Sequence, residues 1–261
     1  MSREGLFAWV ARERRLVAAW DEGEPSVADS WLVEDGRVRG LDRHRARFAD
    51  GCWERHRVAR DLVEEVFDAA VRLLPRAGRW FPRIECGPAG AAQMRLRLRV
   101  APSPPAGPAV VWVPELTDPR TCPRVKGPDL AALVGLREAG RSAGADEALL
   151  RDAGGVVLEG ACTGILWWRG DALCLPAVDL PVLPSVTAGL VVRLALDRGC
   201  LVRRERCRLE ELAGLEVWLV SALWGVRPVS GWLGATIEAG PAGRAPSWDD
   251  DLRAMRTRLE E

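Results

Sequence analysis

The proline-rich segment 101–108, APSPPAGP, most limits what this chain can fold into, because it places four prolines in eight residues. Proline fixes φ and has no backbone N–H, so the segment can continue neither a helix nor a central strand. A chain of 261 residues is long enough for two cores. We therefore predict a small domain over 1–101, a linker over 102–108 and a larger domain over 109–261.

Before the linker, the sequence predicts a hairpin and a helix. Residues 30–40 read as two short strands around Asp35 and Gly36, a pair that favours a positive-φ turn. Apolar residues then recur at spacings of three and four over 58–74, which is typical of an amphipathic helix, and Pro75 ends it.

A strand of unusual composition follows at 94–100, MRLRLRV. Apolar residues and arginines alternate there, which predicts a half-buried strand. On this interpretation Arg95, Arg97 and Arg99 form its solvated face.

The part after the linker is dominated by strand patterns separated by short turns. We predict strands at 109–113, in an antiparallel meander over 147–175, at 200–206 and at 216–222. We predict helices that begin at Gly127-Pro128 and end near Gly144, that run within 183–199 from a cap at Ser185 or Thr187, and that run over 247–259 from a cap at Ser247.

The amino-acid composition excludes several classes of function. The 37 basic and 37 acidic residues are interspersed, which argues against a nucleic-acid or anionic-membrane surface and favours a small-molecule partner. Seven cysteines without a CxxC pair and only two histidines suit neither a disulfide framework nor a metal site. Charges interrupt both the N-terminal region and every long apolar run, so we expect a soluble, cytoplasmic protein with no metal.

Lys126 stands out because it is the one lysine among 37 basic residues. Arginine can replace lysine on a surface, but it is not deprotonated in proteins and cannot act as an amine nucleophile. A lysine that remains in such a chain is a candidate for Schiff-base chemistry. The alternative is compositional drift that happened to leave one lysine in a loop.

Five segments together resemble the class IV aminotransferase family, which includes branched-chain and D-amino acid aminotransferases and aminodeoxychorismate lyase. They occur in the family's order and are LDRHRARF (41–48), VKGPDLAAL (125–133), GADEALLRDAGGVVLEGACTGILWWRG (144–170), LPSVTAG (183–189) and VWLVSALWGVRPV (217–229). The resemblance implies the two-domain α+β fold of type IV pyridoxal-phosphate (PLP) enzymes. It implies a small N-terminal α/β sandwich, a larger C-terminal domain with a mixed barrel-like sheet, PLP as cofactor, and a homodimer.

By this resemblance, Lys126 is the catalytic residue that binds the PLP aldehyde and then moves a proton on the substrate. Glu159 matches the acid that faces the pyridine nitrogen, where a carboxylate keeps the ring protonated. An ordinary strand-end glutamate is the alternative, although the apolar neighbours of Glu159 favour burial.

Arg47 matches the arginine that holds the cofactor phosphate, although the sequence alone does not choose among Arg43, Arg45 and Arg47. His44 is interpreted as a packing or helix-start residue. The phosphate site is completed in the family by residues that match Ser185, Val186, Thr187, Ser221 and Ala222. A helix cap and a buried strand end would explain the same residues without a cofactor.

The chain departs from the family pattern in three places. The phosphate loop has Ser185 where glycine is usual and Ala188 where arginine is usual. Ala131 replaces a tyrosine of the branched-chain enzymes. The segment before Ala28 also lacks an expected Gly- and Phe-containing piece that shapes the substrate pocket in relatives.

Three functions follow from these features. The first is a PLP-dependent aminotransferase that acts on a small amino acid and keto acid pair. The second is an aminodeoxychorismate-lyase-like enzyme that releases pyruvate and an aromatic amine. The segment SALWGVRPV (221–229) most resembles this lyase branch of the family. The third is a degenerate family member that has lost PLP.

Overall fold

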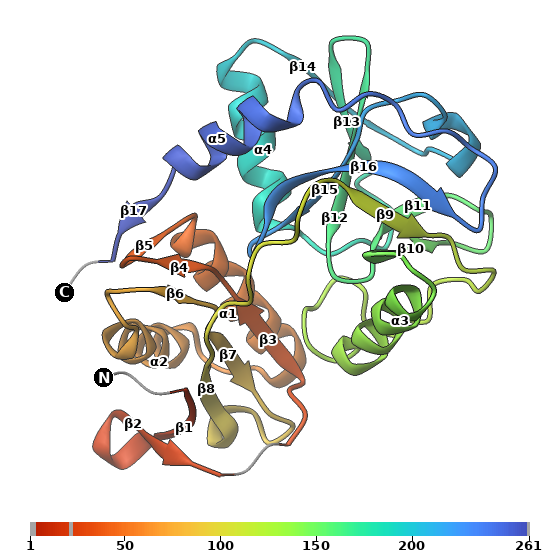
Figure 1. Cartoon of the computed structure of the whole chain (residues 1–261). Coiled ribbons are helices and arrows are strands. Elements are labelled where there is room, and N and C mark those ends of the chain that lie inside the picture. The colour runs from red at the N-terminus through yellow and green to blue at the C-terminus, as the bar shows by residue number, and fades with distance from the viewer. Residues whose placement is uncertain (1–3, 21–22, 260–261) are drawn as a thin grey trace. The chain divides into compact units, whose positions relative to one another are not determined.

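The structure is a computed structural model that describes residues 4–20 and 23–259. The chain forms two compact units, and each combines helices with sheets (Figure 1). The first unit takes the described parts of Met1–Ser103, Val125–Pro128 and Met255–Glu261, and the second takes Pro104–Arg124 and Asp129–Ala254. The predicted α+β class is therefore confirmed.

The first unit contains a five-stranded antiparallel sheet with the order β2-β1-β8-β7-β3. A smaller antiparallel sheet has the order β17-β5-β4-β6, and helices α1 and α2 complete the unit. The elements are β1 (Gly5–Val10), η1 (Ala11–Glu13), β2 (Arg15–Ala19), β3 (Val27–Ser30), β4 (Val33–Glu34), β5 (Arg37–Val38), α1 (Leu41–His56), α2 (Arg60–Leu73), β6 (Arg79–Trp80), β7 (Arg83–Cys86), η2 (Gly90–Gln93), β8 (Met94–Leu98) and β17 (Thr257–Arg258).

The predicted hairpin and helix of the first unit are confirmed. Strands β4 and β5 pair across Asp35 and Gly36, whose φ angles are 47° and 70°. Helix α2 ends at Leu73, just before Pro75. Helix α1 and the β1-β2 hairpin that precedes Ala28 were not predicted from the sequence.

The predicted solvated face of β8 is wrong at Arg95, which is buried. Arg95 and Arg97 both lie against the fully buried carboxylate of Glu85 on β7, with Nε to oxygen distances of 3.3 Å. Arg83 lies 2.6 Å from the same carboxylate. Alternation located the strand, but it could not reveal that an acidic residue on a neighbouring strand lets the arginines lie inside the unit.

The segment Val125–Pro128 packs against β3. The Ala28 N–H donates to the carbonyl of Lys126 at 2.7 Å. Gly127 has a φ of 140°, and a Cβ there would lie 2.7 Å from Cα of Val27, so only glycine fits this approach. The sequence had placed Lys126 in the larger domain, whereas this packing groups it with the first unit. The remaining domain boundaries stay a prediction.

The second unit is built on a curled, mixed sheet of eight strands, which forms a half-barrel (Figure 1). Its order is β11-β10-β9-β16-β15-β12-β13-β14, with parallel pairs at β10-β9, β9-β16 and β13-β14. The elements are β9 (Ala109–Trp112), α3 (Leu130–Ser142), β10 (Glu147–Arg151), β11 (Val157–Gly160), β12 (Gly164–Arg169), β13 (Ala172–Pro176), α4 (Val186–Asp197), β14 (Leu201–Glu205), η3 (Leu209–Leu212), β15 (Val217–Ser221), β16 (Gly225–Leu233) and α5 (Ala245–Ala254).

Two predictions for this unit need correction. The four strands over 147–175 form two separate hairpins rather than one meander, because β11 and β12 are not neighbours in the sheet. Helix α5 begins at Ala245 and not at a Ser247 cap. The buried carboxylate of Glu216 accepts the N–H groups of Arg244 and Ala245 at 2.9 and 3.0 Å, so a residue distant in sequence caps this helix.

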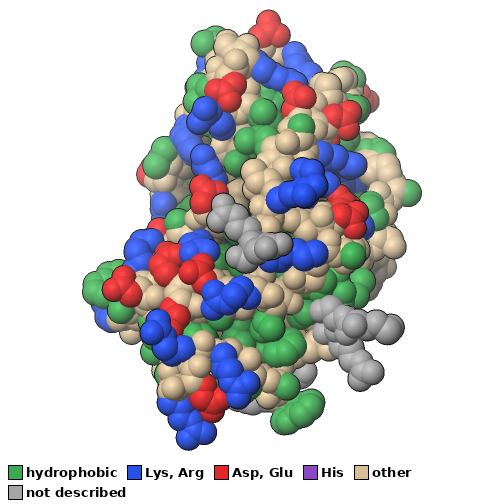
Figure 2. All heavy atoms as spheres, turned by 90° about the vertical axis from the view of Figure 1, so that its left-hand side faces the viewer, with side chains coloured by type: hydrophobic (Ala, Val, Ile, Leu, Met, Phe, Trp, Pro, Cys, Tyr) green, Lys and Arg blue, Asp and Glu red, His purple; other side chains and the backbone are tan. Residues whose placement is uncertain are grey.

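The exterior carries both signs of charge. On the face shown in Figure 2, basic and acidic side chains are interspersed. Within the described ranges, none of the helices is both long and apolar enough to span a bilayer.

Candidate functional site

Glu159 lies near the end of β11 and is buried. Its Oε1 accepts a hydrogen bond from the Leu183 N–H at 2.8 Å and another from Nη1 of Arg120. Within residues 4–20 and 23–259, Oε2 makes no hydrogen bond. One oxygen of a buried carboxylate is therefore fixed, while the other remains available to a donor from outside the chain.

Arg120 holds Glu159 from an irregular segment that the sequence analysis did not single out. Its guanidinium pairs with Asp118 at 2.8 Å and donates to the Pro181 carbonyl at 2.8 Å. Burial raises the pKa of Glu159, while Arg120 and the Leu183 N–H oppose that rise without cancelling it. A carboxylate with a raised pKa is well suited to share a proton with a basic ring nitrogen.

Helix α4 begins directly after the loop that binds Glu159. Ser185 caps it, with Oγ accepting the Ala188 N–H at 3.2 Å, which confirms one of the two predicted caps. Val186 and Thr187 form its first turn and are buried. The first N–H groups of a helix have no partner within the helix, and the dipole favours an anion there.

The end of β15 lies beside this helix start. Gly164 pairs with Val220 in the sheet, and a Cβ on Gly164 would lie 3.4 Å from Cβ and Oγ of Ser185. Ser221 follows Val220 and accepts the Trp224 N–H at 3.0 Å, which turns the chain toward Ala222 and β16. The second unit thus brings together the predicted residues Ser185, Val186, Thr187, Ser221 and Ala222 near the Glu159 loop.

The first unit holds the two other predicted residues, Arg47 and Lys126. Asp29 on β3 is fully buried and accepts hydrogen bonds from Nε and Nη2 of Arg47 at 2.8 and 2.9 Å. His44 Nδ1 lies 2.7 Å from the same carboxylate. Although burial alone would raise the pKa of Asp29, Arg47 and His44 hold it well below its usual range.

Lys126 belongs to the same electrostatic neighbourhood. Burial is the main cause that lowers the pKa of His44, and the positive charges of Arg47 and Lys126 lower it further, against the opposing effect of Asp29. His44 is buried, in agreement with its interpretation as a packing residue. The side chain of Lys126 itself is half-buried.

The structure also separates the three arginines between which the sequence could not choose. Arg43 is exposed. Arg45 turns toward α2, where it pairs with Glu64 and Asp68 at 2.6 Å each. Only Arg47 of these three joins the buried Asp29.

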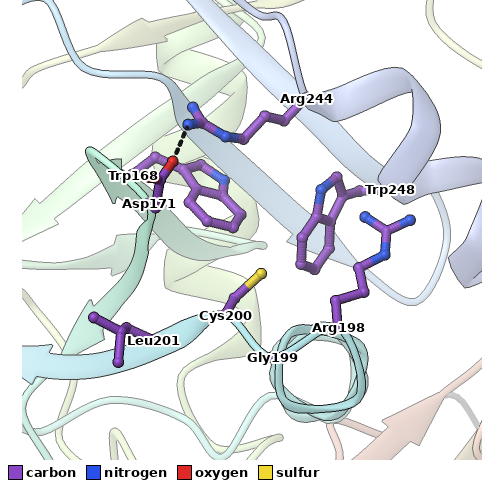
Figure 3. A pocket seen from close by; sticks show the side chains of 8 residues that line it. All are labelled: Trp168, Asp171, Arg198, Gly199, Cys200, Leu201, Arg244 and Trp248. Atoms are coloured by element: carbon purple, nitrogen blue, oxygen red, sulfur yellow. Dashed lines mark hydrogen bonds and ion pairs between the residues drawn. The ribbon is translucent and has the colours of Figure 1, made fainter.

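One further concave region lies elsewhere in the second unit, at the C-terminal end of α4 (Figure 3). It measures about 380 Å³. Arg244 stacks over Trp168 at 4.7 Å and Arg198 over Trp248 at 4.3 Å, while Arg244 also lies 3.4 Å from Asp171. These contacts join α4 and α5 to the sheet, and none of the predicted site residues lines the cavity.

The family of the chain follows from comparison with known proteins. The family model described as amino-transferase class IV matches residues 26–232. The chain belongs to the class IV aminotransferase family. Enzymes of this family use PLP, as the resemblance implied. We found no similar sequence among curated proteins.

Solved structures of several class IV proteins share the fold. A branched-chain amino acid aminotransferase from Escherichia coli has 18% identity and a TM-score of 0.75, over 96% of this chain and 92% of the other. A hypothetical aminotransferase from Mycobacterium tuberculosis has 16% identity and a TM-score of 0.81, over 97% of this chain and 98% of the other. A putative 4-amino-4-deoxychorismate lyase from Legionella pneumophila has 14% identity and a TM-score of 0.75, over 92% and 96%. These likenesses confirm the predicted type IV fold.

The residues of this class IV chain fit PLP chemically. The open oxygen of Glu159 suits a protonated pyridine nitrogen, and the first turn of α4 suits a phosphate. A Cβ at Gly164 would lie 3.2 Å from Cγ2 of Val220 and 3.4 Å from Ser185, so Ser185 packs closely against β12. Lys126 supplies a primary amine, and Arg47 supplies a guanidinium. Arg47 and Lys126 belong to the first unit, and Glu159 and the first turn of α4 belong to the second.

Proposed function

We propose that the chain is a PLP-dependent aminotransferase that acts on a small amino acid and keto acid pair. The observation that carries this proposal is the arrangement at Glu159, where a buried carboxylate has one oxygen fixed by Arg120 and Leu183 and the other open. A buried carboxylate that only forms a structural ion pair has no need of an oxygen without a hydrogen bond. A carboxylate that binds a ring nitrogen needs such an oxygen as the acceptor.

When bound, PLP supplies an aldehyde that condenses with primary amines and a ring that accepts electrons. Lys126 is the anchor in this proposal, because Nζ is the one side-chain amine in the sequence. The same amine would accept the proton of the substrate α-carbon, hold it as an ammonium group and donate it in the later protonation step. Its attachment to β3 through Ala28 and Gly127 limits where Nζ can move.

Glu159 keeps a proton on the ring nitrogen, and Arg120 keeps Glu159 oriented. The N–H groups of Val186 and Thr187 bind phosphate oxygens, together with the Ser221 to Ala222 turn. Arg47 adds a guanidinium, and Asp29 fixes its fork through two hydrogen bonds. Holding Arg47 in this way reduces the conformational entropy that it loses when it binds phosphate.

The second candidate is a lyase of the aminodeoxychorismate type. It is favoured by the segment 221–229, which resembles the lyase branch, and by the absence of tyrosine, including at Ala131. The structural similarity to the Legionella protein is compatible with it. Both reactions begin with loss of the α-proton to Lys126, and they differ in what leaves afterwards.

The first experiment tests the cofactor assignment. PLP is added to the purified chain, the visible spectrum is recorded, and sodium borohydride followed by peptide mapping locates the attached cofactor. We expect colour and one label at Lys126, with the N-terminal amine as internal control. The variant K126R should show no label at position 126 after reduction, because a guanidinium does not condense with PLP. A colourless wild-type protein would support the degenerate alternative and remove both enzyme proposals.

The second experiment separates the two reactions. The PLP-loaded protein is incubated with aminodeoxychorismate, and separately with a panel of amino acids and keto acids. Amino transfer that requires a keto-acid acceptor supports the aminotransferase. Formation of pyruvate and 4-aminobenzoate without an acceptor replaces it by the lyase. A homodimer and a cytoplasmic location are part of this proposal, and sedimentation of the purified chain tests the dimer.

A further inference from the structure

Glu147 is a second buried glutamate of the half-barrel sheet, and it lies at the start of β10. Its Oε2 accepts the Cys162 N–H at 3.2 Å, and its Oε1 accepts the Ala148 N–H at 3.0 Å. Strands β10 and β11 pair in antiparallel fashion up to Gly160. Beyond the end of this pairing, the Glu147 carboxyl group binds the backbone N–H of Cys162. It binds the turn that follows Glu159.

The turn at 160–163 is shaped around the Glu147 side chain. A Cβ on Gly160 would lie 2.9 Å from Cγ of Glu147, and still closer to Oγ1 of Thr163. Glycine is therefore required for Glu147 and Thr163 to pack over the backbone here. The Gly160 N–H donates to the Thr163 carbonyl at 2.8 Å, which closes the turn.

This turn connects the two ends of the proposed cofactor site. Glu159 immediately precedes it, and Gly164, which lies against Ser185, immediately follows it. A change in the turn would move the carboxylate of the ring-nitrogen site relative to the helix start of the phosphate site. Both ends belong to the second unit.

We propose that Glu147 is a positioning residue for the cofactor, which sets the spacing between Glu159 and the N-terminus of α4 through the turn at 160–163. The proposal rests on the proposed function, because it gives Glu147 a role toward PLP. It adds a residue that touches neither the ring nor the phosphate. Glu147 acts through the backbone of Cys162.

The surroundings of Glu147 support a role that depends on its protonation. Burial raises its pKa to about 7, against the opposing effects of the Ala148 N–H, Arg137 on α3, the Cys162 N–H and Thr163. The Thr163 hydroxyl lies beside the carboxyl but makes no hydrogen bond of good geometry to any described residue. A protonated Glu147 can donate to that hydroxyl, which would complete the network around the turn.

The test uses the full chain loaded with PLP that carries ¹⁵N in the ring. The ¹⁵N chemical shift reports whether the ring nitrogen is protonated. We expect E147A to shift the signal toward the unprotonated position and to raise the Kd for PLP about tenfold, because the hydrogen bond that ties the Cys162 N–H to the start of β10 is removed. E147Q keeps an acceptor and can also donate to Thr163, so we expect the wild-type signal.

The matched control is E216A. Glu216 is also a buried carboxylate of the second unit that accepts two backbone N–H groups, but it caps α5. We expect E216A to lose stability while the ring signal stays in place. If E147A does not fold, E147D, which is one methylene shorter, takes its place with the same expected shift.

Hydrogen exchange in the protein without PLP gives an independent measurement. The Cys162 amide should exchange at least tenfold faster in E147A than in wild type, and at the wild-type rate in E147Q. Faster exchange together with an unchanged ring signal and Kd would overturn the proposal, as would a wild-type exchange rate in E147A. If wild type itself fails to bind PLP, the proposed function fails instead, so the two failures are distinguishable.

Discussion

Two buried carboxylates, Asp29 in the first unit and Glu159 in the second, each bind an arginine but differ in their use of it. Asp29 is saturated: Oδ1 and Oδ2 both bind Arg47, and Oδ1 also binds His44 and the Ser30 N–H. Glu159 uses only Oε1 for its arginine and for a backbone N–H, and Oε2 makes no bond within the described ranges.

The pKa directions follow from this difference. At Asp29 the charge of Arg47 and the hydrogen bonds from Arg47 and His44 outweigh burial, so its pKa is lowered, while one arginine does not outweigh burial at Glu159 and its pKa is raised. A saturated carboxylate stabilises the fold and orients its arginine. A carboxylate with an oxygen that makes no hydrogen bond can still accept one from a ligand, as a partner of the proposed cofactor must.

The largest expected effect comes from breaking the saturated site with D29N. The variant leaves Arg47 without its counter-ion and His44 without its carboxylate partner in a buried place, which should cost about 4 kcal/mol of unfolding free energy. Urea denaturation of the protein without PLP measures it. Because the pKa of Asp29 is lowered, the loss should be complete above about pH 4 and shrink as the pH falls further.

The matched control for D29N is D50N. Asp50 forms an exposed ion pair with Arg60 at 2.6 Å and should contribute at most about 1 kcal/mol. Equal losses in D29N and D50N would mean that the buried Asp29 contributes no more to stability than an exposed ion pair does.

The next effect concerns the unsaturated site. R120M removes the cation from Glu159 and from Asp118, and we expect a loss of about 3 kcal/mol in the free energy of unfolding. The double variant R120M/E159Q should recover part of it, because the buried charge is then gone. Urea titrations of the four proteins in the cycle measure the coupling. R124M, which removes only hydrogen bonds to the carbonyls of Val178 and Leu180, is the control.

A third effect should appear as a pH dependence at Glu147. Its folded pKa of about 7 lies above the value of 4.5 for an ordinary glutamate, so wild type loses stability as the pH rises between these values. E147Q does not titrate there. The difference in unfolding free energy between E147Q and wild type should therefore grow by roughly 2–3 kcal/mol from pH 4.5 to pH 7. A difference that stays constant would show that Glu147 does not titrate in this range.

The sequence was sufficient for features set by local chemistry. The turn at Asp35 and Gly36 and the end of α2 before Pro75 were predicted correctly, and Ser185 is one of the two caps predicted for α4. Each depends on residues within a few positions of one another.

Features set by partners distant in sequence could not be found in this way. Arg95 is buried because Glu85 lies on the next strand, and α5 is capped by Glu216. In the candidate site, Glu159 was predicted from the family motif. Arg120 was not predicted, because it belongs to an irregular, proline-containing segment with no periodicity. Asp29 gave one signal that could have been used, since it is a lone acid in a short apolar strand.

The smallest expected effect tests the phosphate end of the unsaturated site. S185A removes the acceptor of the Ala188 N–H and should cost about 1 kcal/mol of stability. It should leave the backbone N–H groups of Val186 and Thr187 able to bind phosphate, so the Kd for PLP should rise less than tenfold. A188R restores the cation that relatives place at this position and should lower that Kd by a few-fold, because an exposed guanidinium adds a charge-assisted hydrogen bond. Fluorescence titration with PLP measures both. If A188R leaves the Kd unchanged, the N-terminus of α4 is not where the phosphate binds, and Glu159 would then have to serve a ligand that extends in another direction.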